Sequence, residues 1–239
     1  MIRPNLYDYL KILAIITMII DHVWLLFFPE LDILRIIGRT SFPLFLFLVW
    51  YNHSYWWKSS LWIYWTILQM LMWIWSYYWL VDMWYANILL AIWCTIVIMY
   101  ITQKHHSLVA EIILYLVSAW LARYTYPYMD YGTLSIVFAL LGYWTRKYGN
   151  TRLISMMITV SVWYHLFFMH SIANFGDQSI LLAFIWVLLF LVMYMMSKRN
   201  YALQASNQQF NQLITTISSY ALEIYLIQIV ILGGIYLII

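Results

Sequence analysis

The sequence predicts an all-α integral membrane protein, a polytopic helical bundle with about nine transmembrane helices. Three observations predict this class. Of the 239 residues, 66% are hydrophobic and only 9% are charged, whereas a soluble domain carries about 25% charged residues. The apolar runs repeatedly reach the length of about 20 residues that a helix needs to cross a bilayer. The runs are also continuous rather than alternating, which is typical of membrane helices rather than strands.

Short polar links separate the apolar runs into nine predicted spans, with boundaries defined to within a few residues. They are residues 6–28, 34–51, 60–81, 84–101, 108–126, 132–147, 152–171, 179–197 and 214–238. The part at 60–101 fits either two or three spans. We expect residues 1–239 to form a single transmembrane domain, with a short polar cytoplasmic linker at residues 198–213.

The distribution of lysine and arginine predicts the orientation, because positively charged loops stay on the cytoplasmic side. With the N-terminus in the cytoplasm, eight basic residues lie on inner segments and three lie near the outer side. The three outer residues are Arg35, Arg39 and Arg123. We therefore expect a cytoplasmic N-terminus and an external C-terminus.

Ionisable side chains concentrate in the first two predicted spans, between residues 11 and 48. The first span ends near the adjacent pair Asp21 and His22, and the second opens with Arg35 and Arg39, four residues apart on one helical face. Charged groups are costly within a membrane helix, so such a cluster is a functional-site hypothesis by default.

Each member of this cluster also has a structural interpretation. Adjacent residues of a helix point about 100° apart, so Asp21 is not expected to hold the His22 ring directly. His22 could act as a general base while Asp21 binds Arg35 or Arg39, or both could simply tie two helices together. The two arginines could bind phosphate or carboxylate bidentately, or they could extend outward to the lipid headgroups.

Other polar residues in the predicted spans have simpler interpretations. Pro43 is expected to bend the second span after Arg39 and to form one wall of a cavity. Glu111 is interpreted as an anchor at the cytoplasmic edge, and Asp130 as the N-cap of the sixth span. Glu223 falls in the middle of the last span, so it must face protein or water.

The sequence argues against several other kinds of site. Cys94 is the only cysteine, which excludes an internal disulfide and a cysteine-based zinc site. His165 and His170 are five residues apart and point to different faces, so no metal site is expected. No run of five basic residues occurs, and we expect no nucleic-acid partner. The histidines beside Lys104 are either solvated or part of a rim that meets a nucleotide-bearing cofactor.

Four blocks of the sequence resemble the TraX family, membrane proteins associated with N-terminal acetylation of F-type conjugative pilin. The first two agree in order and spacing, the third supports them, and the stretch 52–125 rests on hydropathy alone. The blocks are Lys11 to Met18 and Asp21-His22, Leu34 to Phe45 with Gly38-Arg39 at its centre, Asp130-Tyr131-Gly132, and Ser219 to Gln228.

The family is also similar to the wider group of transmembrane acyltransferases, which use a cytoplasmic acyl-CoA to acylate an acceptor reached from the other side. In that group a histidine on a helix is thought to assist the transfer, and His22 is the matching residue. Relatives commonly have a second histidine in the final span where this chain has Gln228. A neutral amide cannot act as a base. The resemblance implies a multi-pass protein of the bacterial inner membrane.

We therefore expect an acetyltransferase that uses acetyl-CoA as co-substrate, without a metal. His22 would be the base, and Asp21 would order Arg39 or the surroundings of His22. Arg39, together with Arg35, would bind a phosphate or polarise the thioester carbonyl. The expected cofactor-binding residues are Arg35, Arg39, Lys11 and Lys58, the last two joined at the adenosine end by Lys104 and Arg146.

The acceptor would be a pilin-like protein, a small molecule or a glycan, reached within or across the lipid bilayer, and self-association stays open. Two other functions remain in view. One is a proton-coupled transporter or flippase with Asp21, His22, Glu111 and Glu223 as a relay, although no internal repeat or matched pair of broken helices supports it. The other is a non-catalytic assembly or immunity factor.

Overall fold

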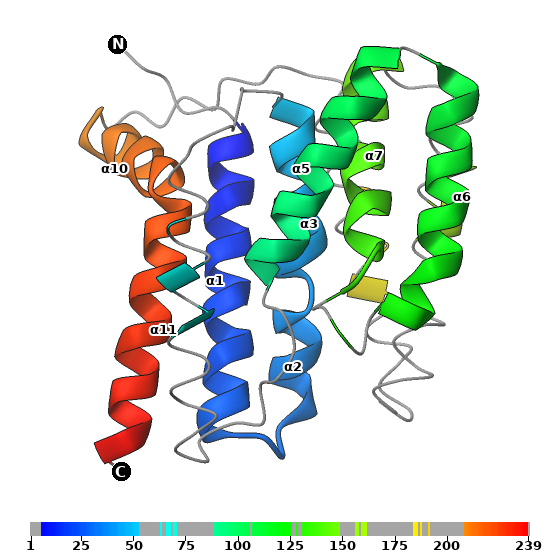
Figure 1. Ribbon diagram of the computed structural model, residues 1–239. Helices are drawn as coiled ribbons and strands as arrows, with labels where there is room; N and C mark the ends of the chain where they lie inside the picture. The colour runs from blue at the N-terminus through cyan, green and yellow to red at the C-terminus, as the bar shows by residue number, and fades with distance from the viewer. Residues whose placement is uncertain are drawn as a thin grey trace. The chain divides into compact units, whose positions relative to one another are not determined.

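The computed structural model describes an all-helical chain, with no strand in the residues that it covers. It describes residues 6–52, 63, 66–67, 69–70, 88–105, 107–125, 128, 131–148, 156–157, 159–161, 184–185, 187, 191 and 208–238. The helices named there (Figure 1) are α1 (Leu6–Phe27), α2 (Asp32–Gly38), α3 (Ser41–Asn52), α5 (Ile88–His105), α6 (Leu108–Thr125), α7 (Leu134–Tyr148), α10 (Gln208–Ser219) and α11 (Ala221–Ile238). The predicted all-α class is confirmed for these residues.

The membrane-spanning helices in the described residues are fewer than the sequence predicts. The segments Tyr7–Phe27 and Leu108–Thr125 are each long and apolar enough to cross a membrane. The pair α10 and α11 adds a third span if the two bent helices are counted as one. The structure thus supports a helical membrane protein but does not show nine spans. Predicted spans that fall mostly outside the described residues are 60–81, 152–171 and 179–197.

The chain divides into two compact units. One consists of Met1–Leu48 and Trp144–Ile239, and the other of Val49–Tyr143. In the first unit α1 packs against α2, α10 and α11, so the two ends of the chain come together around α1. Most of the predicted site residues belong to this unit.

The predicted second span, residues 34–51, is broken into α2 and α3 by a turn at Arg39 and Thr40. The Thr40 hydroxyl donates to the carbonyl oxygen of Ile37 at 2.6 Å, and the Thr40 N–H donates to the same oxygen at 3.2 Å. These bonds satisfy a carbonyl that the end of α2 leaves without a helical partner. Pro43 lies in the first turn of α3, where its missing N–H costs no hydrogen bond. The interruption therefore precedes the proline that was expected to cause it.

The predicted last span, residues 214–238, is also broken. A turn at Tyr220 separates α10 from α11, and their axes differ by 78°. The α10 helix begins at Gln208, inside the stretch predicted as a polar linker. Glu223 was placed mid-helix by the sequence analysis, which is wrong, because the new helix start puts it in the first turn of α11. A carboxylate is favourable there, where the helix N-terminus carries a partial positive charge.

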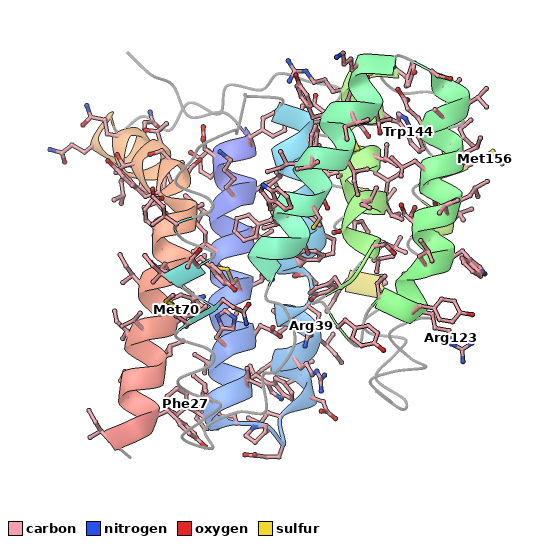
Figure 2. All side chains as sticks on the ribbon, viewed as in Figure 1. Phe27, Arg39, Met70, Arg123, Trp144 and Met156 are labelled. Carbon is pink, nitrogen blue, oxygen red and sulfur yellow. The ribbon has the colours of Figure 1, made fainter. Side chains whose placement is uncertain are left out.

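The first and last helices run side by side in the same direction (Figure 1). Near their starts the Ser218 hydroxyl donates to the Asp8 carboxylate at 2.6 Å. Near their ends the rings of Phe27 and Tyr236 meet edge to face, with centroids 6.1 Å apart; Phe27 is labelled at the end of α1 in Figure 2. The first and last spans of a membrane protein run in the same direction when the total number of spans is odd.

The second unit contains a buried polar face that the sequence analysis misjudged. Glu111 was expected to be an interfacial anchor, but its exposed fraction is 0%. It lies on the buried face of α6 with Tyr115, Ser118 and Ala122, so this face of the helix turns toward protein. Thr95 of α5 also donates to the Ser135 hydroxyl of α7 at 2.9 Å.

The turn before α7 has an unusual backbone. Tyr131 and Gly132 have φ values of 59° and 48°, in the left-handed region that favours glycine. A Cβ on Gly132 would collide with Thr125, whose hydroxyl accepts the N–H of Thr133 at 2.9 Å. The turn therefore ties α6 to the start of α7. Asp130, the predicted N-cap, lies outside the described residues.

Candidate functional site

The second half of α1 carries polar side chains on two different faces. Asp21 faces α2, where it pairs with Arg39, and His22 faces α11, where it meets Gln228. Neighbouring residues of a helix diverge by about 100°, so this divergence follows directly from helix geometry. The structure therefore agrees with the argument that Asp21 does not hold the His22 ring.

Asp21 and Arg39 form an ion pair between α1 and α2. The Nε atom of Arg39 lies 3.8 Å from Oδ1 of Asp21, with side-chain exposures of 14% and 20%. This separation is an ion pair rather than a hydrogen bond. Arg39 is also the C-cap residue of α2, where a positive charge is favoured by the helix dipole. Figure 2 labels Arg39 at this end of α2.

Gly38 allows α2 to approach α1 closely at this pair. A Cβ on Gly38 would lie 2.6 Å from both Cα and Oδ1 of Asp21, which is closer than real Cβ contacts come. The sequence analysis named this glycine only as part of a family block and gave it no packing role. The available signal was a small residue within an apolar membrane segment, since small residues mark close helix contacts in membranes.

Arg35 lies against α1 one turn away from the ion pair. Its guanidinium carbon is 4.5 Å from the centre of the Trp24 ring, which is a cation–π contact. Trp24 is buried, with 7% of its surface exposed. The two contacts, Trp24 with Arg35 and Asp21 with Arg39, follow an antiparallel register between α1 and α2. The predicted pairing of arginines with the first helix is therefore present, with Arg39 as the partner of Asp21.

His22 is held by the last helix. Its Nδ1 atom is 2.6 Å from the side-chain amide nitrogen of Gln228, and its ring is tilted by 39° against Tyr225 at 5.8 Å between centroids. Gln228 and Tyr225 are both 8% exposed and lie three residues apart on the same face of α11. His22 itself is only partly buried. The imidazole is thus held at its Nδ1 edge and on one side by α11.

Gln228 is the site residue whose role the sequence analysis missed. It was noted only as a departure from relatives with a histidine at this position. A signal was nevertheless present, because a polar amide in an apolar terminal helix must find a partner within the protein. The partner, His22, is 206 residues away in the sequence, so no local pattern could identify it.

The predicted cofactor-binding lysines are not brought to this cluster. Lys11 lies three turns before His22 on the same face of α1, about 16 Å away at the helical rise. Lys58 lies outside the described residues. The binding site for the adenosine end stays a prediction. Among the residues that the structure covers, no group of three or more His, Cys, Asp or Glu side chains is placed to hold a metal ion.

Three buried polar atoms around α1 have no hydrogen-bond partner among the described residues: Oδ1 of Asp21, Nε1 of Trp24 and Oε1 of Gln228. Buried polar groups are normally satisfied, and exceptions gather at sites that bind a ligand or water. An anchored imidazole can move a proton, and a nearby guanidinium can stabilise negative charge. The arrangement is therefore suited to general base chemistry on a polar substrate.

Comparison with known proteins settles the family. The family model described as TraX protein matches residues 7–230. This chain belongs to the TraX family. It is also similar to the uncharacterized protein RP591 of Rickettsia prowazekii (strain Madrid E), with 29% identity over 247 residues that cover 98% of this chain and 94% of the relative. No solved structure matches the chain. The TraX resemblance inferred from the sequence blocks is thus confirmed.

Proposed function

We propose that this TraX-family protein is an acetyltransferase of the bacterial inner membrane, which moves an acetyl group from acetyl-CoA to an acceptor amine or hydroxyl. The N-terminus of a pilin-like protein is the acceptor that the family association favours. The observation that carries the proposal is His22, an imidazole inside a membrane helix with Nδ1 anchored to Gln228. Asp21, its neighbour on α1, pairs with Arg39 at the end of α2.

The chemistry assigns one step to each group. The acceptor nitrogen or oxygen attacks the thioester carbonyl, and His22 takes the proton that the acceptor loses. The carbonyl oxygen becomes negative, and Arg39, held by Asp21, stabilises this charge. The carbon–sulfur bond then breaks, and the proton on His22 passes to the leaving sulfur, which gives CoA and the acetylated acceptor. His22 returns to its neutral form.

The layout of α1 supports a path for the donor. Acetyl-CoA is cytoplasmic, and the predicted orientation places the start of α1 on that side. Lys11 would meet the nucleotide end, and the pantetheine arm would follow the face that Lys11 shares with His22, over about 16 Å. Arg35 would hold a phosphate or carboxylate nearer the outer end of the site.

The proposal is tested with purified protein in lipid nanodiscs, given radiolabelled acetyl-CoA and extracts that contain candidate acceptors. The wild-type protein should transfer label, and His22→Ala should abolish transfer while the protein keeps its size and solubility. Gln212→Ala, at an exposed position of α10, is the control and should keep full activity. Full turnover by His22→Ala would show that the base is assigned wrongly. Proton flux without acetyl-CoA would instead favour the transporter.

A further inference from the structure

The contact between His22 and Gln228 determines which ring nitrogen of His22 is available to a substrate. The Nδ1 atom of His22 lies 2.6 Å from the side-chain amide nitrogen of Gln228, whereas the Nε2 atom of His22 has no hydrogen-bond partner among the described residues. His22 is also only partly buried. The nitrogen that faces a substrate is therefore Nε2, and Gln228 controls the opposite nitrogen.

A neutral imidazole has one N–H and one lone pair, so the partner of Nδ1 decides what Nε2 can do. If the amide NH₂ donates to Nδ1, the proton sits on Nε2, which then cannot accept another. If the amide oxygen accepts from Nδ1–H, the lone pair is on Nε2. Rotation of the amide by half a turn exchanges its oxygen and its nitrogen. The surrounding hydrogen bonds and the proposed reaction therefore decide which of the two atoms faces Nδ1.

We propose that Gln228 is a positioning residue whose side-chain oxygen accepts the Nδ1–H of His22 and keeps the lone pair on Nε2. This inference rests on the proposed function, in which Nε2 takes the proton of the acceptor. The structure places the amide nitrogen 2.6 Å from Nδ1 and leaves the buried amide oxygen, Oε1, without a hydrogen-bond partner among the described residues. A half-turn of the amide brings Oε1 to Nδ1 and gives it that partner, and the short separation suits an N–H···O bond better than a contact between two nitrogens. An amide oxygen orients the histidine in the same way in cysteine–histidine–asparagine proteases.

The surroundings keep the amide in place. Gln228 is 8% exposed, and Tyr225, one turn earlier on α11, lies against the His22 ring. The ring is therefore held at its Nδ1 edge and on one side by the same helix. When His22 gains a proton on Nε2, Nδ1–H continues to donate to the amide oxygen, so the contact survives the reaction cycle without a rotation.

The proposal gives a neutral amide a function at this position. Gln228 is not required to take a proton itself. It needs only to accept one hydrogen bond and to hold its partner in one tautomer. At metal sites, removal of a partner that orients a histidine typically costs about 10- to 100-fold in activity, and we expect a loss of similar size here.

The test reads the tautomer directly, by nitrogen NMR of histidine-labelled protein in nanodiscs. The His22 signals are identified by their loss in His22→Ala. Wild type should show the proton on Nδ1, and Gln228→Glu, which can only accept, should show the same. Gln228→Met keeps the side-chain length but removes the acceptor, so the proton should shift to Nε2 in a substantial fraction of molecules. Gln212→Met, at an exposed glutamine of α10, should leave the His22 signals unchanged.

Acetyl transfer by the same preparations gives the second readout. Gln228→Met should lose about 10- to 100-fold of the transfer rate, and Gln228→Glu should lose less. A wild-type proton on Nε2, or an unchanged tautomer in Gln228→Met, would overturn the positioning role. A proton on Nδ1 in a protein that transfers no acetyl group would leave the positioning role intact and refute the proposed function, so the two failures can be told apart.

Discussion

Asp21 and His22 are adjacent in the sequence, but their side chains contact different helices, α2 and α11. Their divergence could be predicted from the sequence, because it follows from the geometry of any helix. The identity of their partners could be predicted only in part. Arg39 was a candidate because it opens a nearby charged segment, whereas Gln228 lies in the last helix and approaches His22 only through the tertiary fold.

At the residue scale, the two arginines should differ in importance. Arg39→Lys should lower acetyl transfer more than Arg35→Lys, because Arg39 pairs with Asp21 through Nε, a nitrogen that lysine lacks. Arg35 contacts Trp24 through a cation–π interaction that a lysine can partly replace. The measurement is the transfer rate of each variant relative to wild type. Equal losses would contradict this ranking.

At the element scale, hydropathy predicts helix content well and helix breaks poorly. The fifth predicted span, 108–126, agrees closely with α6 at Leu108–Thr125, because a continuous apolar run has clear ends. The second and last spans are each broken, although their composition stays apolar. The first break depends on the Thr40 hydroxyl that closes α2, and an average over a window does not contain that local hydrogen bond.

The close packing of α1 and α2 at Gly38 gives a stability prediction. Gly38→Ala should destabilise the protein by about 1–3 kcal/mol, because the new methyl group collides with the backbone and side chain of Asp21. Gly234→Ala is the matched control, since its new Cβ would meet nothing within 4 Å. That change should be neutral or stabilising by up to about 1 kcal/mol. The measurement is thermal or denaturant unfolding in detergent.

A Gly38→Ala protein as stable as Gly234→Ala would show that α2 does not approach Asp21 as closely as described. Gly38→Ala should also reduce acetyl transfer, since it displaces Arg39 from Asp21. Gly234→Ala should leave transfer unchanged.

The contact between α10 and α1 gives a second element-scale prediction. Ser218→Ala removes a hydroxyl that donates to Asp8 across the two helices, so it should lower the free energy of unfolding by about 0.5–1.5 kcal/mol. Ser219→Ala is the control, because that exposed hydroxyl bonds only to its own helix. Both are measured by unfolding in the same detergent. Equal stabilities would argue that the α10 contact contributes nothing.

At the scale of the whole molecule, the parallel direction of α1 and α11 fixes the relation between the chain ends. If α1 and α11 both cross the membrane, the N-terminus and the C-terminus lie on opposite sides. The sequence predicted this arrangement from the charge bias and from the odd number of spans. It could not predict that the two helices touch, because contact between the chain ends is a property of the tertiary fold.

Single cysteines added at each end test this relation in a Cys94→Ser background. A thiol reagent that does not cross membranes should label the C-terminal cysteine of intact cells, and the N-terminal cysteine only after the membrane is opened. A cysteine in an extracellular loop of another membrane protein serves as the positive control. Labelling of both ends from the same side would contradict the arrangement of α1 and α11 as parallel spans.

The central claim is that an imidazole within a membrane helix performs acyl transfer. Its most direct measurement is the rate of CoA release coupled to acceptor acetylation by purified protein in nanodiscs, compared between wild type and His22→Ala. Loss of a general base predicts a fall of at least about 100-fold in His22→Ala with unfolding behaviour unchanged. Equal rates in the two proteins, or no acetyl-CoA-dependent release in wild type, would contradict the claim.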